Sequence, residues 1–553
     1  MSIEEHIRRV DFYRLGSGAA LLVLLAFYSP VMLLVLSPTY GALPAHIFHV
    51  YGLGVFAGAG WFLKDHIQMR FGRLAAYMLP VLAFWTPTLQ YFVMQQSSKL
   101  GNPLGPVVTE LFGYYPLALL TVAVAGKQIQ YALHLEGMGD VAVEHVPLLG
   151  SYFVYSIGEH FAKALLSRAI GFTVVFSRAG LQFVIAILYA AVIPSKLLLL
   201  AIPSVLFSIT SDVHLGGISG VNSAIQNEGY SILARQESYT GYLSVLENHI
   251  DGFRVMRCDH SLLGGQWTKG ASGYHPKAED PIYAVFTMLE SVRLVEGSHG
   301  SHRVDAGSKA LVIGLGVGTT PAAFMKHGID TTVVEIDPVV VKFAEQYFNF
   351  PSNHAVTIED ARKFVKRASK SPSVHQYDYI VHDVFTGGAE PAELFTVDFL
   401  HDLSSLLKDD GVIAINYAGD LNLYPTGLVV RTILATFPTC RIFREHAPTG
   451  ENLVKSENPD FVNMVVFCTK STNTPLRFRN PEQADFLGSD SRESYLLPKH
   501  EIDPAIFDHI PHGGRRLLVD KEVKRLYKYQ DRGALEHWEI MRTVIPAAVW
   551  ENW

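Results

Sequence analysis

The stretch KALVIGLGVGTTPAAFMKHGIDTTVVEID, residues 309–337, combines an apolar strand, a glycine turn, a helix and a second strand that ends on an acid. Gly314, Gly316 and Gly318 allow the backbone to approach a ligand closely. The helix expected to begin near Thr320 turns its free N–H groups toward the same place. The stretch therefore predicts a nucleotide-binding unit of alternating strands and helices.

The acid that ends the second strand is Glu335, which is placed to accept hydrogen bonds from both ribose hydroxyls of a nucleotide. Position 319 is threonine, whereas the dinucleotide-binding fingerprint has glycine there. The spacing therefore favours an adenosyl-sulfonium ligand over NAD.

Strands and helices continue to alternate after this unit, as a parallel sheet demands. Three further apolar runs, 356–358, 379–381 and 412–415, lead into Glu359-Asp360, His382-Asp383 and Asn416. In an open α/β sheet, ligands lie outside the carboxyl ends of the strands. We therefore expect the carboxylates of residues 335, 360 and 383 to converge on one crevice.

The first part of the chain has a different character. No Asp, Glu, Lys or Arg occurs in 15–63 or in 74–98, and a helix needs about 20 apolar residues to span a bilayer. The apolar segment 179–211 contains Pro194, Lys196 and Pro203 and is expected to form a helical hairpin, or one span with a re-entrant piece. We expect about six spans, the clearest at 15–36, 46–63, 74–95 and 106–126.

Residues 143–168 allow two interpretations. An apolar stripe lies on one helical face, while Glu159 and Lys163 lie on another. Such a helix can lie flat on the membrane, or it can span the membrane with its charges buried against neighbouring helices.

Basic residues precede the first expected span and follow the second, whereas the loop 37–46 between them is uncharged. The positive-inside rule then places the N-terminus in the cytosol, and an even number of spans also returns the C-terminal catalytic domain to the cytosol. This predicts a multi-pass integral membrane protein. The basic residues are Arg8, Arg9, Arg14, Lys64, Arg70 and Arg73.

The 553 residues are too many for a single domain, and a net charge of −7 gives no reason to expect nucleic-acid binding. Cys258, Cys440 and Cys468 are far apart and suggest neither a metal site nor a disulfide, so buried, reduced thiols are expected. The expected domains are a helical membrane domain (1–212), a linker with a small β-region (213–300), a Rossmann-like domain (301–478) and a C-terminal helical extension (479–553).

Four motifs together resemble the spermidine synthase family of aminopropyltransferases, and more closely its branch in which a multi-span region precedes the catalytic domain. The resemblance covers roughly residues 230–470 and implies the class I methyltransferase type of fold. The motifs are VIGLGVG (312–318), VVEIDP (333–338), IEDAR (358–362) and YDYIVHDVFTGGAEPAELFT (377–396).

The resemblance also implies roles for individual residues. Glu335 would hold the ribose, Asp360 would bind the adenine amino group beside Ala361, and Asp383 would be the general base that takes a proton from an attacking amine. Residues 386–388 would form a gate over the site, and a homodimer is implied. The cofactor-binding set is Gly314, Gly316, Gly318, Glu335, Asp337, Asp360 and Ala361, and the substrate-binding set is Gln236, Tyr239, Tyr283 and Glu390.

Three departures from the family pattern affect the expected site and reaction. Val317 stands where the family's glycine turn usually carries an acid that can pair with the aminopropyl group of decarboxylated S-adenosylmethionine. The second acid after Asp383 is also missing, and Ala284-Val285 replaces the family's His-Glu pair. S-adenosylmethionine itself then fits at least as well as the decarboxylated cofactor.

Three hypotheses follow. The first is aminopropyl transfer to a small-molecule amine at the membrane surface, with Asp383 as the base. The second is methyl transfer from S-adenosylmethionine to a hydrophobic or lipid-like acceptor. The third is a membrane protein without enzymatic activity that senses adenosyl ligands.

Overall fold

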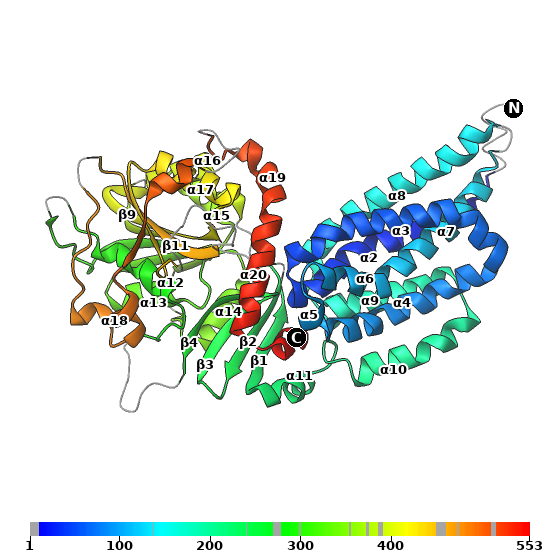
Figure 1. The fold of residues 1–553 in the computed structure, drawn as a ribbon, viewed down its shortest axis with the longest axis horizontal. Coiled ribbons are helices and arrows are strands. Elements are labelled where there is room, and N and C mark those ends of the chain that lie inside the picture. Colours follow the sequence, from blue (N-terminus) through cyan, green and yellow to red (C-terminus); the bar gives the residue numbers. More distant parts are fainter. Residues whose placement is uncertain are drawn as a thin grey trace. The chain divides into compact units, whose positions relative to one another are not determined.

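The computed structural model describes eleven stretches of the chain, and these divide into two compact units (Figure 1). The helical unit comprises residues up to Glu228 together with Gln236–Tyr242 and Ile545–Trp553, and the sheet unit comprises Gly229–Arg235 and Leu243–Val544. The described stretches are 10–135, 138–238, 240–268, 278–297, 300–352, 355–371, 375–384, 391–448, 461–472, 475–509 and 516–553.

The helical unit is built from long apolar helices whose interior is filled by leucine, tyrosine and alanine side chains. Its longer helices are α2 (Phe12–Tyr40), α3 (Ala42–Phe71), α4 (Arg73–Met94), α7 (Tyr114–Leu133), α8 (Asp140–Ala169) and α9 (Arg178–Val192). Its shorter helices are α5 (Ser97–Leu100), α6 (Leu104–Phe112), α10 (Ile202–Thr210), α11 (Ile218–Ile225) and α21 (Ala547–Glu551).

Among the described residues, two helices, α2 and α3, are long and apolar enough to cross a membrane, and a third span results if α6 and α7, bent by 49°, count as one. This is fewer than the six expected spans. The segment 179–211 forms α9 and α10, joined by a 3₁₀ turn, and both helices are shorter than the bilayer core requires.

Helix α8 resolves the ambiguity of residues 143–168 in part. A stripe of mostly small residues packs inward, and a Cβ at Gly158 would meet the Cβ of Ala26 on α2 at 3.0 Å. The apolar stripe faces outward, with Phe153 and Phe161 each 65% exposed. The inward stripe consists of Pro147, Ser151, Gly158, Ala162 and Leu166.

The sheet unit contains two sheets. The smaller has the order β1-β2-β3-β4, and the larger has the order β12-β10-β11-β9-β8-β5-β6-β7. The small sheet consists of β1 (Tyr230–Glu237), β2 (Tyr242–Asn248), β3 (Phe253–Cys258) and β4 (Ser261–Trp267). The large sheet consists of β5 (Lys309–Ile313), β6 (Asp330–Glu335), β7 (Ala355–Ile358), β8 (Tyr377–His382), β9 (Leu407–Asp420), β10 (Thr439–Arg444), β11 (Phe461–Thr469) and β12 (His500–Ile502).

The five strands predicted from the sequence are present as β5 to β9 and run parallel to one another. Residues of β5 alternate between two cores: Leu311 and Ile313 pack into one, and Ala310 and Val312 into the other. Both faces of the sheet are therefore buried, which explains why these strands read as continuous apolar runs. The Rossmann-like fold predicted for this half is confirmed.

Helices cover both faces of the large sheet. Helices α12, α13 and α14 contribute to one core, and α15, α16 and α17 contribute to the other. Their bounds are α12 (Ala284–Leu289), α13 (Thr319–Lys326), α14 (Pro338–Tyr347), α15 (Ala361–Ala368), α16 (Val397–Leu406) and α17 (Tyr424–Thr436), followed by α18 (Asp490–Tyr495), α19 (Val523–Leu526) and α20 (Gln530–Val544).

The C-terminal extension contributes to the interior of the sheet unit. Arg492 on α18 forms a fully buried, two-pronged ion pair with Glu290, at 2.8 and 2.9 Å. Asp485 accepts hydrogen bonds from both Arg293 and Arg479. Strand β12 adds a strand to the sheet edge, so the extension is not purely helical.

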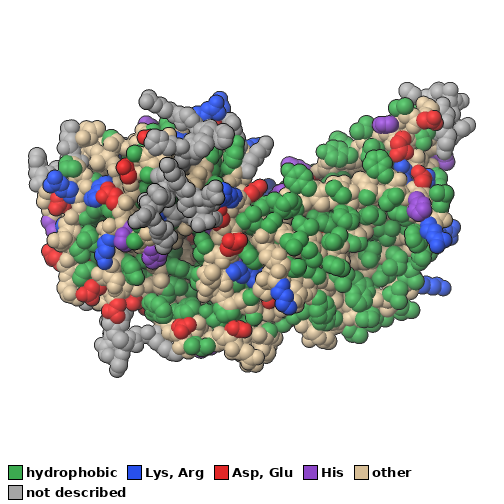
Figure 2. Space-filling view, viewed as in Figure 1, with side chains coloured by type: hydrophobic (Ala, Val, Ile, Leu, Met, Phe, Trp, Pro, Cys, Tyr) green, Lys and Arg blue, Asp and Glu red, His purple; other side chains and the backbone are tan. Residues whose placement is uncertain are grey.

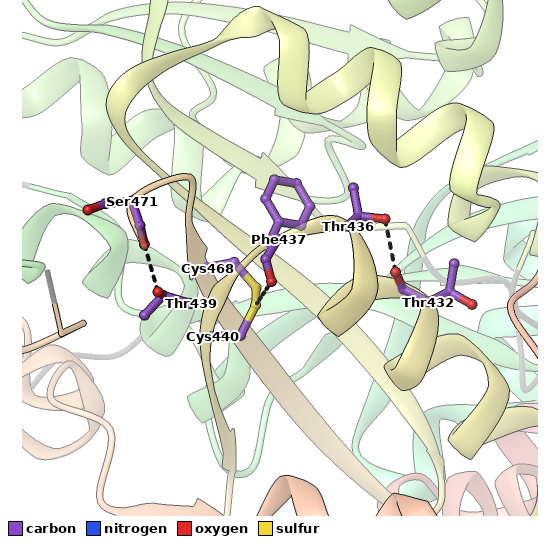
Figure 3. The surroundings of a disulfide bond; sticks show 7 residues. All are labelled: Thr432, Thr436, Phe437, Thr439, Cys440, Cys468 and Ser471. Atoms are coloured by element: carbon purple, nitrogen blue, oxygen red, sulfur yellow. Dashed lines mark hydrogen bonds between the residues drawn. A yellow bond between two sulfur atoms is a disulfide. The ribbon is translucent and has the colours of Figure 1, made fainter. Parts of the chain in front are cut away.

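The prediction of three reduced thiols is wrong for two of them. Cys440 on β10 and Cys468 on β11 are bonded, with Cα atoms 4.1 Å apart (Figure 3). The two strands are antiparallel, and their register places these residues directly opposite each other. Cys258 is a reduced, partly exposed thiol.

Candidate active site

The predicted site lies at the carboxyl ends of the parallel strands of the large sheet, where the chain direction changes. From β5 the chain moves to β6 and β7 on one side, whereas β8 and β9 lie on the other. This is the topological switch point at which open α/β sheets bind ligands. The glycine turn after β5 and Asp383 after β8 meet here, because the Asp383 N–H donates to the carbonyl of Ile313 at 2.8 Å.

Gly314 is the position in this turn that most requires glycine. Its φ is +88°, in the left-handed region, and a Cβ there would overlap the carbonyl oxygen of Asp383. Gly316 and Gly318 also have positive φ, and Gly318 directly precedes α13. The turn therefore lies directly against the backbone of Asp383, whereas the approach of its backbone to a ligand stays a prediction.

The carboxylate of Glu335 is held rigidly beside the turn. One oxygen accepts the N–H of Leu315 and the other accepts the N–H of Asp337, each at 2.9 Å. Burial raises the pKa of Glu335, whereas these backbone N–H groups oppose the rise. The N–H of Ile336 also bonds to this carboxylate, so not every lone pair remains available to a ribose hydroxyl.

Asp360 and Asp337 are both helix caps. Asp360 accepts the N–H of Arg362 at the start of α15, and Asp337 accepts the N–H of Val339 at the start of α14, each at 2.8 Å. Asp337 is 1% exposed, so its carboxylate stabilises the fold rather than facing the crevice. Asp360 is partly exposed, and Ala361 beside it is buried.

The N–H of Glu359 donates to the carbonyl of Glu335, which brings the end of β7 against the end of β6.

Asp383 has a partner that the sequence reading did not assign. Asn416, one residue beyond the β8–β9 pairing of His382 with Ile415, donates its Nδ2 to Asp383 Oδ1 at 2.8 Å. Burial raises the pKa of Asp383 to about 6, although the bond from Asn416 opposes the rise. The signal that could have pointed to Asn416 was its position at the end of the strand next to β8.

The predicted substrate-binding residues are less well assembled. Tyr283, at the start of α12, has a buried hydroxyl with no hydrogen-bond partner in the described part of the chain, and burial and the charge of Glu445 raise its pKa. Gln236 lies near the end of β1 in the helical unit. Tyr239, Glu390 and the expected gate at 386–388 lie outside the described residues.

These residues fit an adenosyl-sulfonium ligand. A fixed carboxylate, Glu335, lies beside the glycine turn and can accept hydrogen bonds from a ribose. Val317 is 6% exposed and packs among apolar side chains, so this turn presents no acid to an aminopropyl ammonium group. Within the described ranges, no group of three or more His, Cys, Asp or Glu side chains could hold a metal ion.

Comparison with known proteins identifies the family. An N-terminal histidine N-methyltransferase of Emericella nidulans is 62% identical over 550 residues, which cover 98% of each chain. The chain belongs to the N-terminal histidine N-methyltransferase family. The spermine/spermidine synthase domain matches residues 296–424 only.

More distant likenesses cover less than half of the chain. A polyamine aminopropyltransferase of Vibrio vulnificus is 34% identical over 142 residues, 25% of this chain and 47% of that one. The solved structure of human methyltransferase-like protein 13 in complex with SAH is 22% identical, with a TM-score of 0.27, and covers 40% of this chain and 92% of that one.

As a member of the N-terminal histidine N-methyltransferase family, the chain is an enzyme, a methyltransferase that uses S-adenosylmethionine. Of the three hypotheses, methyl transfer is the one supported. Aminopropyl transfer and a place in polyamine biosynthesis are not supported, and the sensor without activity is excluded.

Proposed function

We propose that the chain methylates a nitrogen of the N-terminal histidine of a polypeptide. The observation that carries this proposal is the 62% identity to the Emericella nidulans enzyme along almost the full length of both chains. The acceptor is then a polypeptide end with an imidazole and an α-amino group, rather than a diamine or a lipid.

S-adenosylmethionine supplies a methyl group on a sulfonium, an excellent leaving group. The acceptor nitrogen forms its new bond to the methyl carbon while the carbon–sulfur bond breaks and its electron pair stays on sulfur. The nitrogen can attack only when unprotonated, and Asp383, with a pKa of about 6, is ionised at neutral pH and can take the departing proton. Alignment within the crevice supplies much of the remaining rate.

A panel of short peptides tests the proposal. The purified full-length protein is incubated with S-adenosylmethionine and with peptides that begin with His, with acetyl-His or with Ala, and with one that carries His only at an internal position. We expect a mass gain of one methylene, located on the first residue by fragmentation, only for the free N-terminal His. Equal modification of the internal His, or of none of the peptides, would refute the proposed acceptor.

We also propose that the helical unit anchors the protein in a lipid bilayer. Large apolar side chains are exposed on its helices, among them Phe62 on α3 (84% exposed) and Phe153 on α8 (65% exposed). Figure 2 shows hydrophobic side chains covering most of the visible face of these helices. Exposed apolar surface of this extent is typical of membrane contact. The protein should therefore stay with the membrane pellet after alkaline washing of membranes. Its recovery in the supernatant would refute the proposal that the helical unit is a membrane anchor.

Two features favour different positions of the sheet unit, on the cytosolic or on the opposite side of the membrane. The basic residues around the first spans favour a cytosolic sheet unit, whereas the disulfide of Cys440 and Cys468 favours an oxidising compartment. We propose the oxidising side, because a disulfide is rarely maintained in the cytosol. Protease added to sealed vesicles that expose the cytosolic face should then leave the sheet unit intact; its digestion would place the unit in the cytosol.

A further inference from the structure

Asn416 has an unusual hydrogen-bonding state for a side chain that is only 7% exposed. Its Nδ2 donates to Asp383, but its Oδ1 is buried and has no partner among the described residues. An unpaired buried carbonyl oxygen of this kind costs about 1–3 kcal/mol. In a native protein, such a group needs an explanation, and a bound ligand is one.

The position of Asn416 suggests which ligand. In the β8–β9 pairing, His382 is opposite Ile415, so Asp383 and Asn416 are the next residues of two adjacent strands. One oxygen of Asp383 accepts from Asn416, and the described residues provide no partner for the other. The hydrogen-bonded pair therefore retains two acceptor atoms, Asp383 Oδ2 and Asn416 Oδ1, for which the described residues provide no donor.

We propose that Asn416 is a specificity-determining residue whose Oδ1 accepts an N–H of the acceptor substrate, while its Nδ2 positions the Asp383 carboxylate. This inference rests on the proposed function. An N-terminal histidine carries N–H groups on both its α-amino group and its imidazole, and two acceptors can hold both. A group with a single N–H leaves one of the two oxygens unpaired, which disfavours its binding.

The role of Oδ1 toward the acceptor substrate and the role of Nδ2 toward Asp383 can be tested by different substitutions. Asn416→Asp keeps an oxygen toward the acceptor but removes the N–H donor and adds a carboxylate beside Asp383. Asn416→Leu removes both functions at a similar volume. A matched control is Asn463→Leu on the neighbouring strand β11, where Nδ2 likewise donates to a carboxylate, that of Glu445, at 3.2 Å.

The experiment measures two quantities for each variant of the full-length protein. One is the affinity for a His-initiated peptide by calorimetry without S-adenosylmethionine, and the other is the acid limb of kcat/KM against pH. For Asn416→Leu we expect peptide affinity to fall about 10- to 100-fold, as for a lost hydrogen bond to a charged group. For Asn416→Asp we expect affinity close to wild type, and an acid limb shifted upward by about one pH unit, because a second carboxylate raises the pKa of the first.

Asn463→Leu should change neither quantity. Thermal stabilisation by S-adenosylmethionine, measured for every variant, shows whether the sheet unit is folded. Unchanged peptide affinity in Asn416→Leu, or an unmoved acid limb in folded Asn416→Asp, would overturn the inference. If the wild type methylates no His-initiated peptide, the proposed function fails instead, and the two failures are thereby distinguished.

Discussion

Asp383 and Glu335 are both carboxylates at strand ends, yet their surroundings suit them to different tasks. Glu335 accepts backbone N–H groups with both oxygens, so its orientation is fixed and it can serve as a static acceptor. Asp383 accepts a single amide N–H, and its pKa of about 6 places its proton exchange near neutral pH. A group with these properties is suited to proton transfer.

Replacing this carboxylate should affect catalysis far more than cofactor binding. In Asp383→Asn we expect kcat to fall about 10²- to 10⁴-fold, the usual contribution of a general base. In the wild type, both Asp383 and the acceptor imidazole must lose a proton, so log kcat/KM should fall below pH 6 with a slope approaching two. In the variant only the imidazole remains, and a slope of one is expected.

The same substitution should stabilise the protein at alkaline pH. The pKa of Asp383 is about 6 in the folded state and about 4 in an unfolded chain, so its contribution to stability is present below pH 4 and is lost as pH rises through 6. Asp383→Asn should therefore raise the free energy of unfolding at pH 8 by up to about 3 kcal/mol and have little effect at pH 4. Denaturant titrations of the ligand-free protein at the two pH values check this, and equal effects at both would contradict it.

Individual strands and helices show how far the sequence could predict this fold. The turn after β5 and the acids after β6, β7 and β8 could be predicted from the sequence, because glycines and apolar runs mark the ends of strands locally. The residues that contact them in the fold could not be predicted in this way. The pairing of Cys440 with Cys468, and of Asn416 with Asp383, depends on the register between strands, which single-sequence patterns do not define.

The contribution of α18 was missed for a related reason. Arg492 reads as an ordinary surface charge in a polar segment, and only the fold shows that it is buried against Glu290, about 200 residues earlier in the chain. Likewise, the apolar stripe of α8 was readable, but the finding that small residues, not this stripe, face α2 required the packed structure.

Breaking the ion pair on α18 should destabilise the sheet unit strongly. Arg492→Met leaves Glu290 buried without its partner, which typically costs about 3–5 kcal/mol. Arg441→Met is the matched control, because its pair with Glu501 is partly exposed and should contribute at most about 1 kcal/mol. Urea unfolding of both variants compares the two, and Glu290→Leu combined with Arg492→Met should recover much of the loss.

At the scale of the whole molecule, the division into two units predicts a selective response to ligand. S-adenosylmethionine should bind the sheet unit, whose crevice contains the glycine turn, and at 100 times its Kd it should stabilise that unit by about 2.7 kcal/mol. Calorimetry of the detergent-solubilised protein should then show one unfolding transition that rises with ligand and one that does not move. Removing the ligand by dialysis should reverse the shift, and a common shift of both transitions would mean that the units unfold together.

The helical unit is assembled from three separate parts of the chain, and its last part comes from beyond the sheet unit. Trp553 stacks on His214 with ring centroids 4.1 Å apart, and Glu551 accepts a hydrogen bond from Ser97 at 2.6 Å. Cutting the gene at residue 228 would therefore leave the helical unit incomplete, because the first product would lack Trp553 and the other C-terminal residues that pack in this unit. During synthesis, the helical unit can therefore complete its packing only after the whole sheet unit has left the ribosome.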